Sequence, residues 1–489
     1  MEQRDVVVVG SGFGGLVAGG LAARAGLRVT VLEAHTRPGG CAGDFALDGF
    51  WFPAGATVVT GLEPGGILDR VFRALGRPVA ARALDPSIVI HFPGQSLPYM
   101  ASHSDWLRTF ERAFPAAGPG YRRFWNWAHL AGGAVYEIGT HLPSLPLRTL
   151  ADLRRTVPAL AGRGALAVPL LPFTVGQVKA VLGARGCAEA DALIDGVLLD
   201  ATGCTAVDAS AVQGAIALDL YRRGCQWVDG GTGRLAMSLV RAIRGSGGEV
   251  HFARPVTALR QSGRGWTVEV GGSPAFDART VVANIPAAAF ARLAGSRRPP
   301  PVRDRDAWGA FVLHLGIDGE DLEYPGPFHQ VIDPAAPVHE AAASALVSIY
   351  PGRGVRSARW SLSVSTHTSP AAWQGLDAGS ACRRRLQLED RLIGAAERVI
   401  PGVRGRVLVR RSATPLTYER FTGRPGGYVG GLRQRRGVVA LLAPDHRPAP
   451  GTFLAGDHVF PGQGTVGVAL SGINAYRDVA DYLGRRPLL

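Results

Sequence analysis

Two glycine-rich stretches near opposite ends of the chain have residue types that can bind anionic groups. The first is Gly10-Ser-Gly-Phe-Gly-Gly15, and the second runs from Ala455 to Gly472 with the sequence AGDHVFPGQGTVGVALSG. Each lies between a short apolar run and a helix-like segment, an arrangement in which the N–H groups of a helix N-terminus bind phosphate oxygens. The two stretches could form two independent phosphate loops or two walls of one site.

The elements around the first stretch have the order of a dinucleotide-binding unit. Asp5–Val9 is a β-branched run followed by glycine, which is typical of a buried parallel strand. Residues 16–26 predict a helix of small residues that could pack close to a sheet, and Leu27–Glu33 predicts a second strand that ends in an acid. Strand, turn, helix and strand together predict a Rossmann-type unit.

Each glycine of this fingerprint has a physical role. Gly10 permits the tight turn, Gly12 lets the backbone approach a pyrophosphate, and Gly15 allows close packing of helix and strand. Glu33 lies twenty-one residues after Gly12, close to the ~20 expected for a carboxylate that meets a ribose hydroxyl. This acid by itself does not distinguish FAD from NAD.

The residues after Glu33 resemble a flavoprotein family that includes amine oxidases, protoporphyrinogen oxidase and phytoene desaturases. Four residues after the acid, Arg37-Pro-Gly-Gly-Cys-Ala-Gly43 carries a second glycine pair, which lies near the cofactor phosphates and the flavin in that family. The resemblance implies that the cofactor is FAD and that Arg37, Gly39 and Gly40 contact it. A plain surface turn after the strand is the alternative interpretation.

The segment that follows Gly43 narrows the resemblance to a smaller group of enzymes within this flavoprotein family. Gly49-Phe-Trp-Phe-Pro-Ala-Gly-Ala-Thr57 is similar to the F-D-x-G-x-T segment of the family, but Pro53 stands where the family usually has Asp. No contact from that acid is therefore expected. The run from Gly39 to Gly66 most resembles C-3',4' carotenoid desaturases, and next carotenoid isomerases and retinol saturase.

The C-terminal stretch resembles the segment that closes the FAD site in the same family. Gly451–Asp457 predicts a short strand that ends in Gly-Asp, and residues 465–483 predict a helix. The resemblance implies that Gly456 and Asp457 face the ribityl chain or the pyrophosphate, and that the helix start faces the flavin pyrimidine. A helix N-terminus would stabilise the negative charge of reduced flavin there. We therefore expect one site built from both chain ends.

Other segments resemble further parts of the cofactor site. Asp229–Leu235 is similar to the G-G-x-x-x-L segment at which the family chain returns to the cofactor domain, and Thr414–Gly431 to the segment beside the flavin. Glu249–Val256 predicts a strand, and the resemblance implies that the backbone of its last residue contacts the adenine. The complete set of expected cofactor-binding residues is Gly10, Gly12, Gly14, Gly15, Glu33, Arg37, Gly39, Gly40, Val256, Gly456, Asp457, Gly467 and Val468.

The resemblance implies an α/β fold in which two domains interleave. One is a Rossmann-type FAD-binding domain, as in glutathione reductase and amine oxidases, and the other is an α+β substrate domain. The expected FAD-binding segments are residues 1–75, 226–294 and 413–489. The expected substrate segments are residues 76–225, which include a membrane-facing part, and residues 295–412.

The cysteines and histidines give little evidence of a disulfide, a metal site or a catalytic group. The five cysteines are spread out without a Cys-x-x-Cys pair, which argues against a disulfide framework or a metal centre and fits a reducing cytoplasm. The twelve histidines lack metal-ligand spacing, and His314 and His367 are expected to be hydrogen-bonded core or cavity residues. His458 replaces the small residue expected after Asp457 and is a candidate for proton handling. No catalytic residue is assigned from the sequence.

The formal charge of +14 comes almost entirely from arginine, because Lys179 is the only lysine. A genome rich in G and C could produce this bias, and attraction to an anionic membrane surface is the functional alternative. The arginines are scattered rather than clustered, so nucleic acid is not an expected partner.

The middle of the chain has two apolar features. His141–Gly183 contains Ala165–Phe173, which prolines break too often for it to span a bilayer. It either docks on a membrane or covers the core as a proline-rich turn. Tyr121–Trp127 has aromatic residues at helical spacing and either packs in the core or forms a wall of a lipophilic tunnel. The expected location is cytoplasmic, with peripheral association with the membrane.

The resemblance implies an FAD-dependent carotenoid desaturase. It would form a double bond of the 3,4 type near one end of an acyclic carotenoid, with or without a hydroxyl group. Hydride transfer from an allylic carbon needs a long apolar tunnel and correct positioning more than a strong base. A cis–trans isomerase or a polyene saturase on the same scaffold is the alternative. A lipid carrier without bound flavin is the alternative from another class, and the sequence does not determine the oligomeric state.

Overall fold

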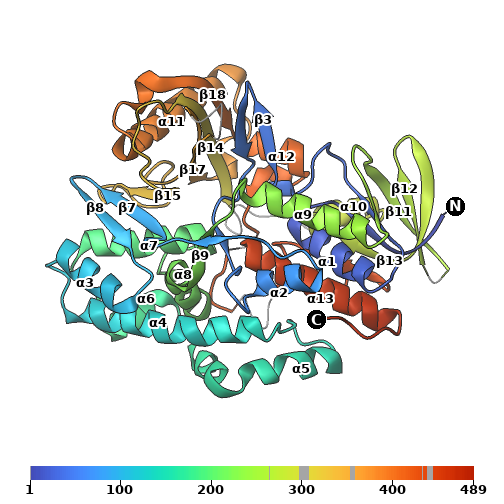
Figure 1. Ribbon diagram of the computed structural model, residues 1–489. Helices are drawn as coiled ribbons and strands as arrows, with labels where there is room; N and C mark the ends of the chain where they lie inside the picture. Colours follow the sequence, from blue (N-terminus) through green and yellow to red (C-terminus); the bar gives the residue numbers. More distant parts are fainter. Residues whose placement is uncertain (1, 264, 297–307, 353–357, 432, 438–443) are drawn as a thin grey trace.

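Two β-sheets organise the computed structural model, which describes residues 2–263, 265–296, 308–352, 358–431, 433–437 and 444–489 (Figure 1). The first sheet has the strand order β10-β2-β1-β13-β12-β11, with β20 beside β13. Its strands come from widely separated parts of the chain: β1 Glu2–Val9, β2 Val29–Leu32, β10 Glu249–His251, β11 Val256–Ser262, β12 Gly265–Val270, β13 Ser273–Ala283 and β20 Thr452–Leu454.

The first sheet is parallel where it carries the glycine fingerprint. β1 pairs in parallel with β2 and β13, and β20 pairs in parallel with β13, whereas β11 and β12 extend the sheet in antiparallel pairs. Residues 6–9 are buried, as expected for a parallel strand that is covered on both faces.

The prediction of a single strand over residues 249–256 is wrong. β10 ends at His251, and β11 begins only at Val256. Ala253 adopts a φ of 53°, in the left-handed region, and Pro255 has no N–H to donate. Because neither residue can continue a ladder of strand hydrogen bonds, the chain turns between the two strands.

Helices pack on the first sheet and bring the two ends of the chain together. The helices concerned are α1 Phe13–Arg24, α2 Ile67–Ala74, α9 Gly231–Gly245 and α13 Thr465–Tyr482. They share one buried core that also contains Val6, Val8 and Val31 of the sheet. Helix α1 crosses α13 where both carry glycine: a Cβ on Gly472 would lie 2.3 Å from the carbonyl oxygen of Gly14. The crossing therefore depends on the absence of a side chain.

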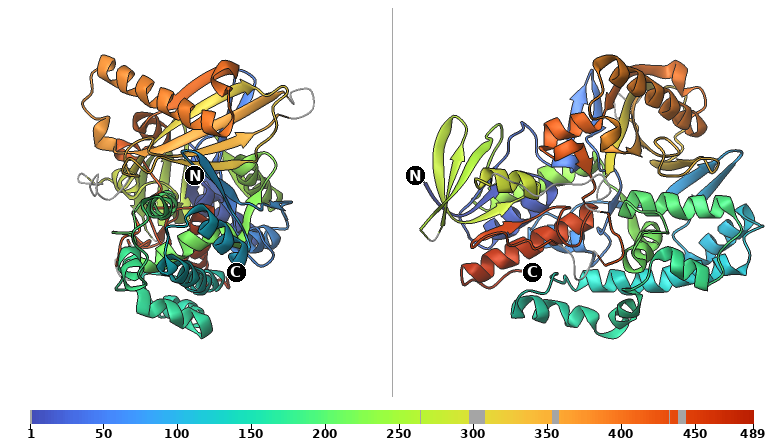
Figure 2. Two further views of the ribbon diagram at one scale, coloured as in Figure 1. Left: turned by 90° about the vertical axis from the view of Figure 1, so that its left-hand side faces the viewer. Right: turned by 180° about the vertical axis from the view of Figure 1, so that it is seen from behind.

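The second sheet has the order β18-β14-β17-β16-β15-β7-β8, with β19 beside β14. Its strands are β7 Ile88–Phe92, β8 Gln95–Tyr99, β14 Trp308–Asp318, β15 Phe328–Ile332, β16 Ser344–Tyr350, β17 Arg359–Thr368, β18 Val407–Ala413 and β19 Tyr428–Val429. Helix α11, Ala378–Val399, covers one face through a core that includes Leu313, Val347 and Leu392. In Figure 2 this sheet and α11 lie above a layer of helices, and the first sheet lies beside both.

The layer of helices below the second sheet comes from the middle of the chain. It consists of α3 His103–Ala113, α4 Pro119–Thr140, α5 Leu150–Thr156, α6 Val175–Val181, α7 Ala188–Thr202 and α8 Ala211–Gly224. The side chains of Tyr121, Phe124 and Trp125 in α4 are fully buried and pack with Trp106 and other apolar residues. These three residues therefore belong to the core, which was one of the two interpretations of Tyr121–Trp127.

The remaining elements are short. They include β3 Asp44–Leu47, β4 Phe50–Pro53, β5 Val59–Thr60, β6 Arg82–Ala83, β9 Cys225–Trp227, α10 Ala287–Leu293 and α12 Pro415–Thr422. The first sheet takes its strands from the three segments expected to bind the cofactor, and the second takes most of its strands from the two other segments. The domain boundaries themselves stay a prediction.

The crossing of α1 and α13 predicts opposite effects for one substitution at two helical glycines. Gly472→Ala places a methyl group against the carbonyl of Gly14 and should lower the free energy of unfolding by about 1–3 kcal/mol. In Gly394→Ala, in α11, the added methyl group has no neighbouring atom within 4 Å. This substitution should raise the free energy of unfolding by up to about 1 kcal/mol. Urea denaturation of both variants measures the difference, and equal stability of the two would contradict a tight crossing.

Candidate dinucleotide-binding site

The candidate site lies where the parallel strands of the first sheet end. β1, β2, β13 and β20 are followed by Gly10, Glu33, Asn284 and Ala455 respectively. The carboxyl ends of parallel strands meet at one edge of a sheet, and ligands bind in the crevice outside that edge. The structure therefore brings the N-terminal and C-terminal glycine stretches to the same edge.

The N-terminal loop is tightly built. Gly10 has a φ of 91° and donates its N–H to the carbonyl of Leu32 at 2.8 Å. Gly39 donates to the carbonyl of Ser11 at 2.8 Å, and a Cβ on Gly40 would lie 3.4 Å from the Cα of Gly12. The second glycine pair thus lies directly against the first fingerprint and is not a separate surface turn.

Glu33 is held in one orientation. Its side chain is buried, and one carboxylate oxygen accepts hydrogen bonds from the N–H of Ser11 at 2.7 Å and its hydroxyl at 2.6 Å. The other oxygen accepts from the N–H of His35 at 2.8 Å. The N–H of Arg254 donates to the carbonyl of Glu33, which keeps the turn that leads to Val256 beside this acid.

Arg37 lies at the rim of the site. It forms an ion pair with Asp44 at 3.0 Å, and more than half of its side chain is exposed. The structure therefore gives it a protein partner besides any ligand.

Asn284 fills the centre of the site and was not identified from the sequence. A Cβ on Gly12 would lie 2.3 Å from its Oδ1, and one on Gly15 would lie 2.7 Å from its Cβ. Its Nδ2 donates to the carbonyl of Ala455 at 2.8 Å, while its Oδ1 is buried without a hydrogen-bond partner among the described residues. A polar residue directly after a buried parallel strand was the sequence signal that could have located it.

The C-terminal stretch completes the same edge. A Cβ on Gly14 would lie 2.9 Å from the carbonyl oxygen of Val468 and 3.3 Å from the nitrogen of Gly456. Gly467, in the first turn of α13, packs against the carbonyl of Gly462. No side chain in the described part of the chain caps the N-terminus of α1 or of α13. Two open helix N-termini therefore lie side by side, an arrangement suited to anionic groups.

Asp457 has a partner that the sequence analysis missed. Both of its carboxylate oxygens accept hydrogen bonds from Arg424, at 2.8 and 2.9 Å. Burial alone would raise the pKa of Asp457, but the Arg424 guanidinium outweighs burial and holds this pKa well below its usual range. His458 lies beside the pair, with its Nδ1 3.8 Å from Asp457 and its buried Nε2 without a hydrogen-bond partner among the described residues.

One face of the second sheet carries the paired polar residues His314 and Ser363. His314 is buried, as expected for a core histidine, and its Nδ1 lies 3.0 Å from the hydroxyl of Ser363. Burial lowers its pKa to about 4, so its ring is neutral near pH 7. The same ring contacts Phe45 and Phe52 of the β3–β4 hairpin. This hairpin therefore connects the sheet face to the N-terminal loops.

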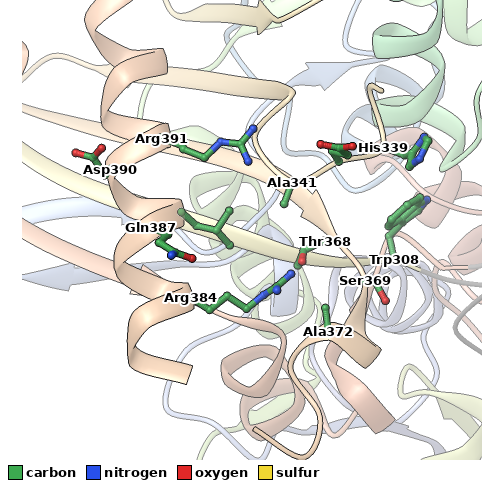
Figure 3. Close-up of a pocket in the computed structure, with 12 residues that line it drawn as sticks. Trp308, His339, Ala341, Thr368, Ser369, Ala372, Arg384, Gln387, Asp390 and Arg391 are labelled. Atoms are coloured by element: carbon green, nitrogen blue, oxygen red, sulfur yellow. The ribbon is translucent and has the colours of Figure 1, made fainter. Parts of the chain in front are cut away.

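A separate cavity of about 770 Å³ opens between α11 and the edge of the second sheet (Figure 3). Its walls carry both charges and a large aromatic ring; the lining residues are Trp308, His339, Glu340, Ala341, Thr368, Ser369, Ala372, Arg384, Gln387, Leu388, Asp390 and Arg391. In Figure 3 Arg384 and Arg391 extend from α11 toward the two segments that carry Thr368 and Ala341. The cavity contains none of the predicted cofactor-binding residues.

The described residues contain no cluster of histidine, cysteine and acidic side chains that could hold a metal ion. Within the same residues, no helix has both the length and the apolar character needed to cross a membrane.

Comparison with known proteins supports the class of the site. Residues 8–75 match the model of an NAD(P)-binding Rossmann-like domain. Prolycopene isomerase 2 from an Oncidium hybrid cultivar is 26% identical to this chain, and the match covers 99% of this chain and 85% of the isomerase. A zeta-carotene-forming phytoene desaturase from Myxococcus xanthus is 28% identical over 58% of this chain and 53% of its own. Human all-trans-retinol 13,14-reductase is 26% identical over 51% of this chain and 41% of its own.

Solved structures agree on the fold. Cyclohexylamine oxidase from Brevibacterium oxydans superposes with a TM-score of 0.62 at 15% identity, over 99% of this chain and all of that one. The relatives and the motifs at both chain ends support an oxidoreductase that is similar to carotenoid desaturases and isomerases. Its Rossmann-type α/β fold is the one that the sequence predicts.

The ion pair between Arg424 and Asp457 predicts a pH-dependent loss of stability. Arg424→Gln leaves a buried carboxylate without its cation and should lower the free energy of unfolding by about 3–5 kcal/mol near pH 7. Because the folded pKa of Asp457 is depressed, the pair stabilises the protein above the unfolded value of ~3.9 and loses this effect as the pH falls. The deficit of the variant should therefore shrink in acid.

Urea denaturation between pH 2 and pH 7 measures this deficit, because the change is expected below the unfolded pKa of ~3.9. Arg260→Gln is the matched control, because it removes one partner of an ion pair whose side chains are 69% and 38% exposed and should change stability little. A similar loss in both variants, or a deficit of Arg424→Gln that does not vary with pH, would contradict the role assigned to the buried pair.

Proposed function

We propose that the chain is an FAD-dependent carotenoid desaturase that introduces a 3,4-type double bond near one end of an acyclic carotenoid. The observation that carries the proposal is the pair of open helix N-termini of α1 and α13 at one sheet edge. One such terminus suits the pyrophosphate of a dinucleotide, and the other suits the charge that a reduced flavin carries. When bound, FAD supplies the acceptor for a hydride that leaves an allylic carbon.

The residues around these termini fit FAD in our proposal. Glu33, fixed by Ser11 and His35, binds the ribose, and the backbone at Val256 meets the adenine. Gly39 and Gly40 follow the cofactor from the phosphates toward the flavin. The orphan Oδ1 of Asn284 gives the site a buried acceptor for a donor on the ligand.

The remaining predicted contacts come from the C-terminal half of the site. Gly456 and Asp457 lie beside the ribityl chain or the pyrophosphate, and Gly467 and Val468 lie beside the pyrimidine. In this arrangement Arg424 keeps Asp457 ionised and adds a cation near the phosphates. Arg37 contributes from the rim.

The polar face of the second sheet favours a substrate that carries a hydroxyl group. The hydroxyls of Ser348 and Tyr350 are buried without hydrogen-bond partners in the described part of the chain. Ser348 pairs across the sheet with Ser363, the partner of His314, and the ring of Tyr350 packs against Trp51 and Trp227. Because an unpaired buried hydroxyl is costly, a hydroxylated end group would gain hydrogen bonds that an unsubstituted polyene cannot make.

A carotenoid cis–trans isomerase is the second candidate. The observation in its favour is the prolycopene isomerase match, which spans almost the whole chain, whereas the desaturase match spans little more than half. The two activities differ in electron balance: a desaturase removes two hydrogens and needs an acceptor, whereas an isomerase returns a product of unchanged composition. A saturase would add hydrogens and shorten the conjugation.

Product analysis tests these candidates. The purified protein, reconstituted with FAD, is incubated with an acyclic 1-hydroxylated carotenoid and an electron acceptor. The pigments are then separated by chromatography, and their masses are measured by mass spectrometry. We expect a product two hydrogens lighter whose absorption lies at longer wavelength. A geometric isomer of unchanged mass would support the isomerase instead, and a protein that binds no flavin would support a lipid carrier.

Glu33→Gln serves as the control of this experiment. It keeps the shape of the side chain but removes the charge, so FAD should bind more weakly and the product yield should fall at limiting FAD. Flavin fluorescence measures the binding. Unchanged affinity would overturn the assignment of Glu33 to the ribose.

We also propose that residues 147–173 dock the protein on a membrane. Nine large apolar side chains in this segment are exposed: Leu147, Leu150, Leu153, Val157, Leu160, Leu166, Val168, Leu171 and Phe173. Arg148 and Arg154 are exposed among them. Apolar residues flanked by arginines are typical of segments that insert into the interface of a bilayer with anionic lipids. Figure 1 shows α5 of this segment projecting from the layer of helices, away from both sheets.

Vesicle flotation tests the docking segment. Leu166→Asp should release most of the protein from vesicles that contain anionic lipid, because it places a charge in the apolar surface. Leu408→Asp is the matched control, since Leu408 is also 60% exposed but lies in β18 on the second sheet. If both variants float as well as the unaltered protein, this segment does not dock.

A further inference from the structure

Asp200 and His367 form an ionisable pair outside the predicted cofactor-binding set. Asp200 lies in the last turn of α7, and His367 lies near the end of β17. The Nδ1 of His367 is 3.6 Å from the Oδ1 of Asp200, and the Nε2 of Gln330 donates to the Oδ2 of Asp200 at 2.8 Å. Neither arginine nor lysine lies within ion-pair distance of Asp200 among the described residues.

The pKa values of Asp200 and His367 differ from those expected of two oppositely charged partners in a structural ion pair. Burial raises the pKa of Asp200 to about 7, and burial together with the positive charge of Arg433 lowers the pKa of His367 to about 4. An ion pair would move both values in the opposite directions, because each charge would stabilise the other. The position of Asp200 at the C-terminal, negative end of α7 also disfavours its ionised form. Near neutral pH the imidazole is therefore uncharged, and the carboxyl group is close to half ionised.

The pair lies against the loop that precedes α13. The Nε2 of Gln463 donates to the backbone carbonyl of Asp200 at 3.2 Å, and a Cβ on Gly430 would lie 2.2 Å from the Oε1 of Gln463. Gln463 thus connects Asp200 to the two segments expected beside the flavin, Thr414–Gly431 and the C-terminal stretch.

The surroundings of the pair are aromatic and enclosed. Trp308 packs edge-on against His367 with ring centroids 6.0 Å apart, and it donates its Nε1–H to the carbonyl of Gly203. Burial raises the pKa of Tyr221 of α8, and the nearby charge of Asp200 raises it further. Asp200 and His367 keep 17% and 22% of their side-chain surface accessible although desolvation dominates both pKa values. Both side chains are therefore largely, but not fully, withdrawn from solvent.

We propose that Asp200, with His367 beside it, is the proton acceptor of the polyene reaction at the loop that holds Gln463. The step rests on the proposed function. One carbon of a saturated C–C bond loses a hydride, with both electrons, to the bound flavin. The neighbouring carbon loses its proton to the Asp200 carboxylate, and the electrons of that C–H bond form the new double bond. His367 then shares the proton with Asp200 and orients the carboxyl group.

Infrared spectroscopy of the flavin-loaded protein tests the ionisation of the pair without substrate. Asp200 should give a carboxylic acid C=O band at pH 5.5 that disappears as the pH rises through about 7, and Asp200→Asn should remove this band. His367→Gln should shift the midpoint of the transition. A band that titrates near pH 4, or one that persists unchanged in Asp200→Asn, would overturn the inference.

Kinetics test the role in the reaction. Asp200→Asn should lower kcat by about 100-fold or more, as expected for loss of a general base, and should abolish a rise of kcat with pH near 7 while FAD binding is retained. Asp191→Asn is the matched control, because Asp191 lies on the same helix but faces Lys179. Full activity of Asp200→Asn would overturn the inference. A protein with the expected infrared transition that makes no polyene product would instead overturn the proposed function.

Discussion

The contact between Gly14 of α1 and Gly472 of α13 determines where the two ends of this chain can meet. At that crossing a carbonyl oxygen occupies the space of a methyl group, so the helices approach more closely than side chains permit. The N-termini of both helices consequently reach the same edge of the first sheet, nearly the whole chain length apart in sequence. Asn284 fills the remaining space between Gly12 and Ala455 and holds the two stretches in contact.

Two largely buried acids, one in the loop that precedes α13 and one beside it, differ in charge because their partners differ. Asp457 faces a guanidinium with both oxygens, and this cation more than offsets the cost of burial. The side-chain partners of Asp200 within the described residues are an amide and an uncharged imidazole, so burial dominates and favours the protonated form. The first acid therefore suits a fixed negative charge beside a cofactor, and the second suits the exchange of a proton at neutral pH.

The parts of the fold that the sequence predicts are those set by local structure. The turn at Gly10, the helix after it and the acid at Glu33 lie within one βαβ unit, where spacing alone fixes the geometry. The left-handed conformation of Ala253 leaves no pattern in the sequence, whereas Pro255 was a visible signal of the break between β10 and β11 that the prediction of one strand overlooked. Arg424 and Asn284 were missed for another reason. Each acquires its role from a contact with a distant segment, and one sequence without relatives does not show such pairs.

The proposed membrane surface is fixed relative to the site through α13. Arg447 bonds Asp152 of α5 with two hydrogen bonds, at 2.7 and 3.0 Å, and also binds Asp478 of α13. Arg155 of α5 reaches Asp478 and Asp481. Because Asp152 and Asp478 are buried and satisfied by several donors, α5 cannot rotate about α13 without losing buried ion pairs. The helix whose N-terminus faces the proposed cofactor site therefore also holds the apolar segment in place, so a substrate drawn from a bilayer would enter with a defined orientation.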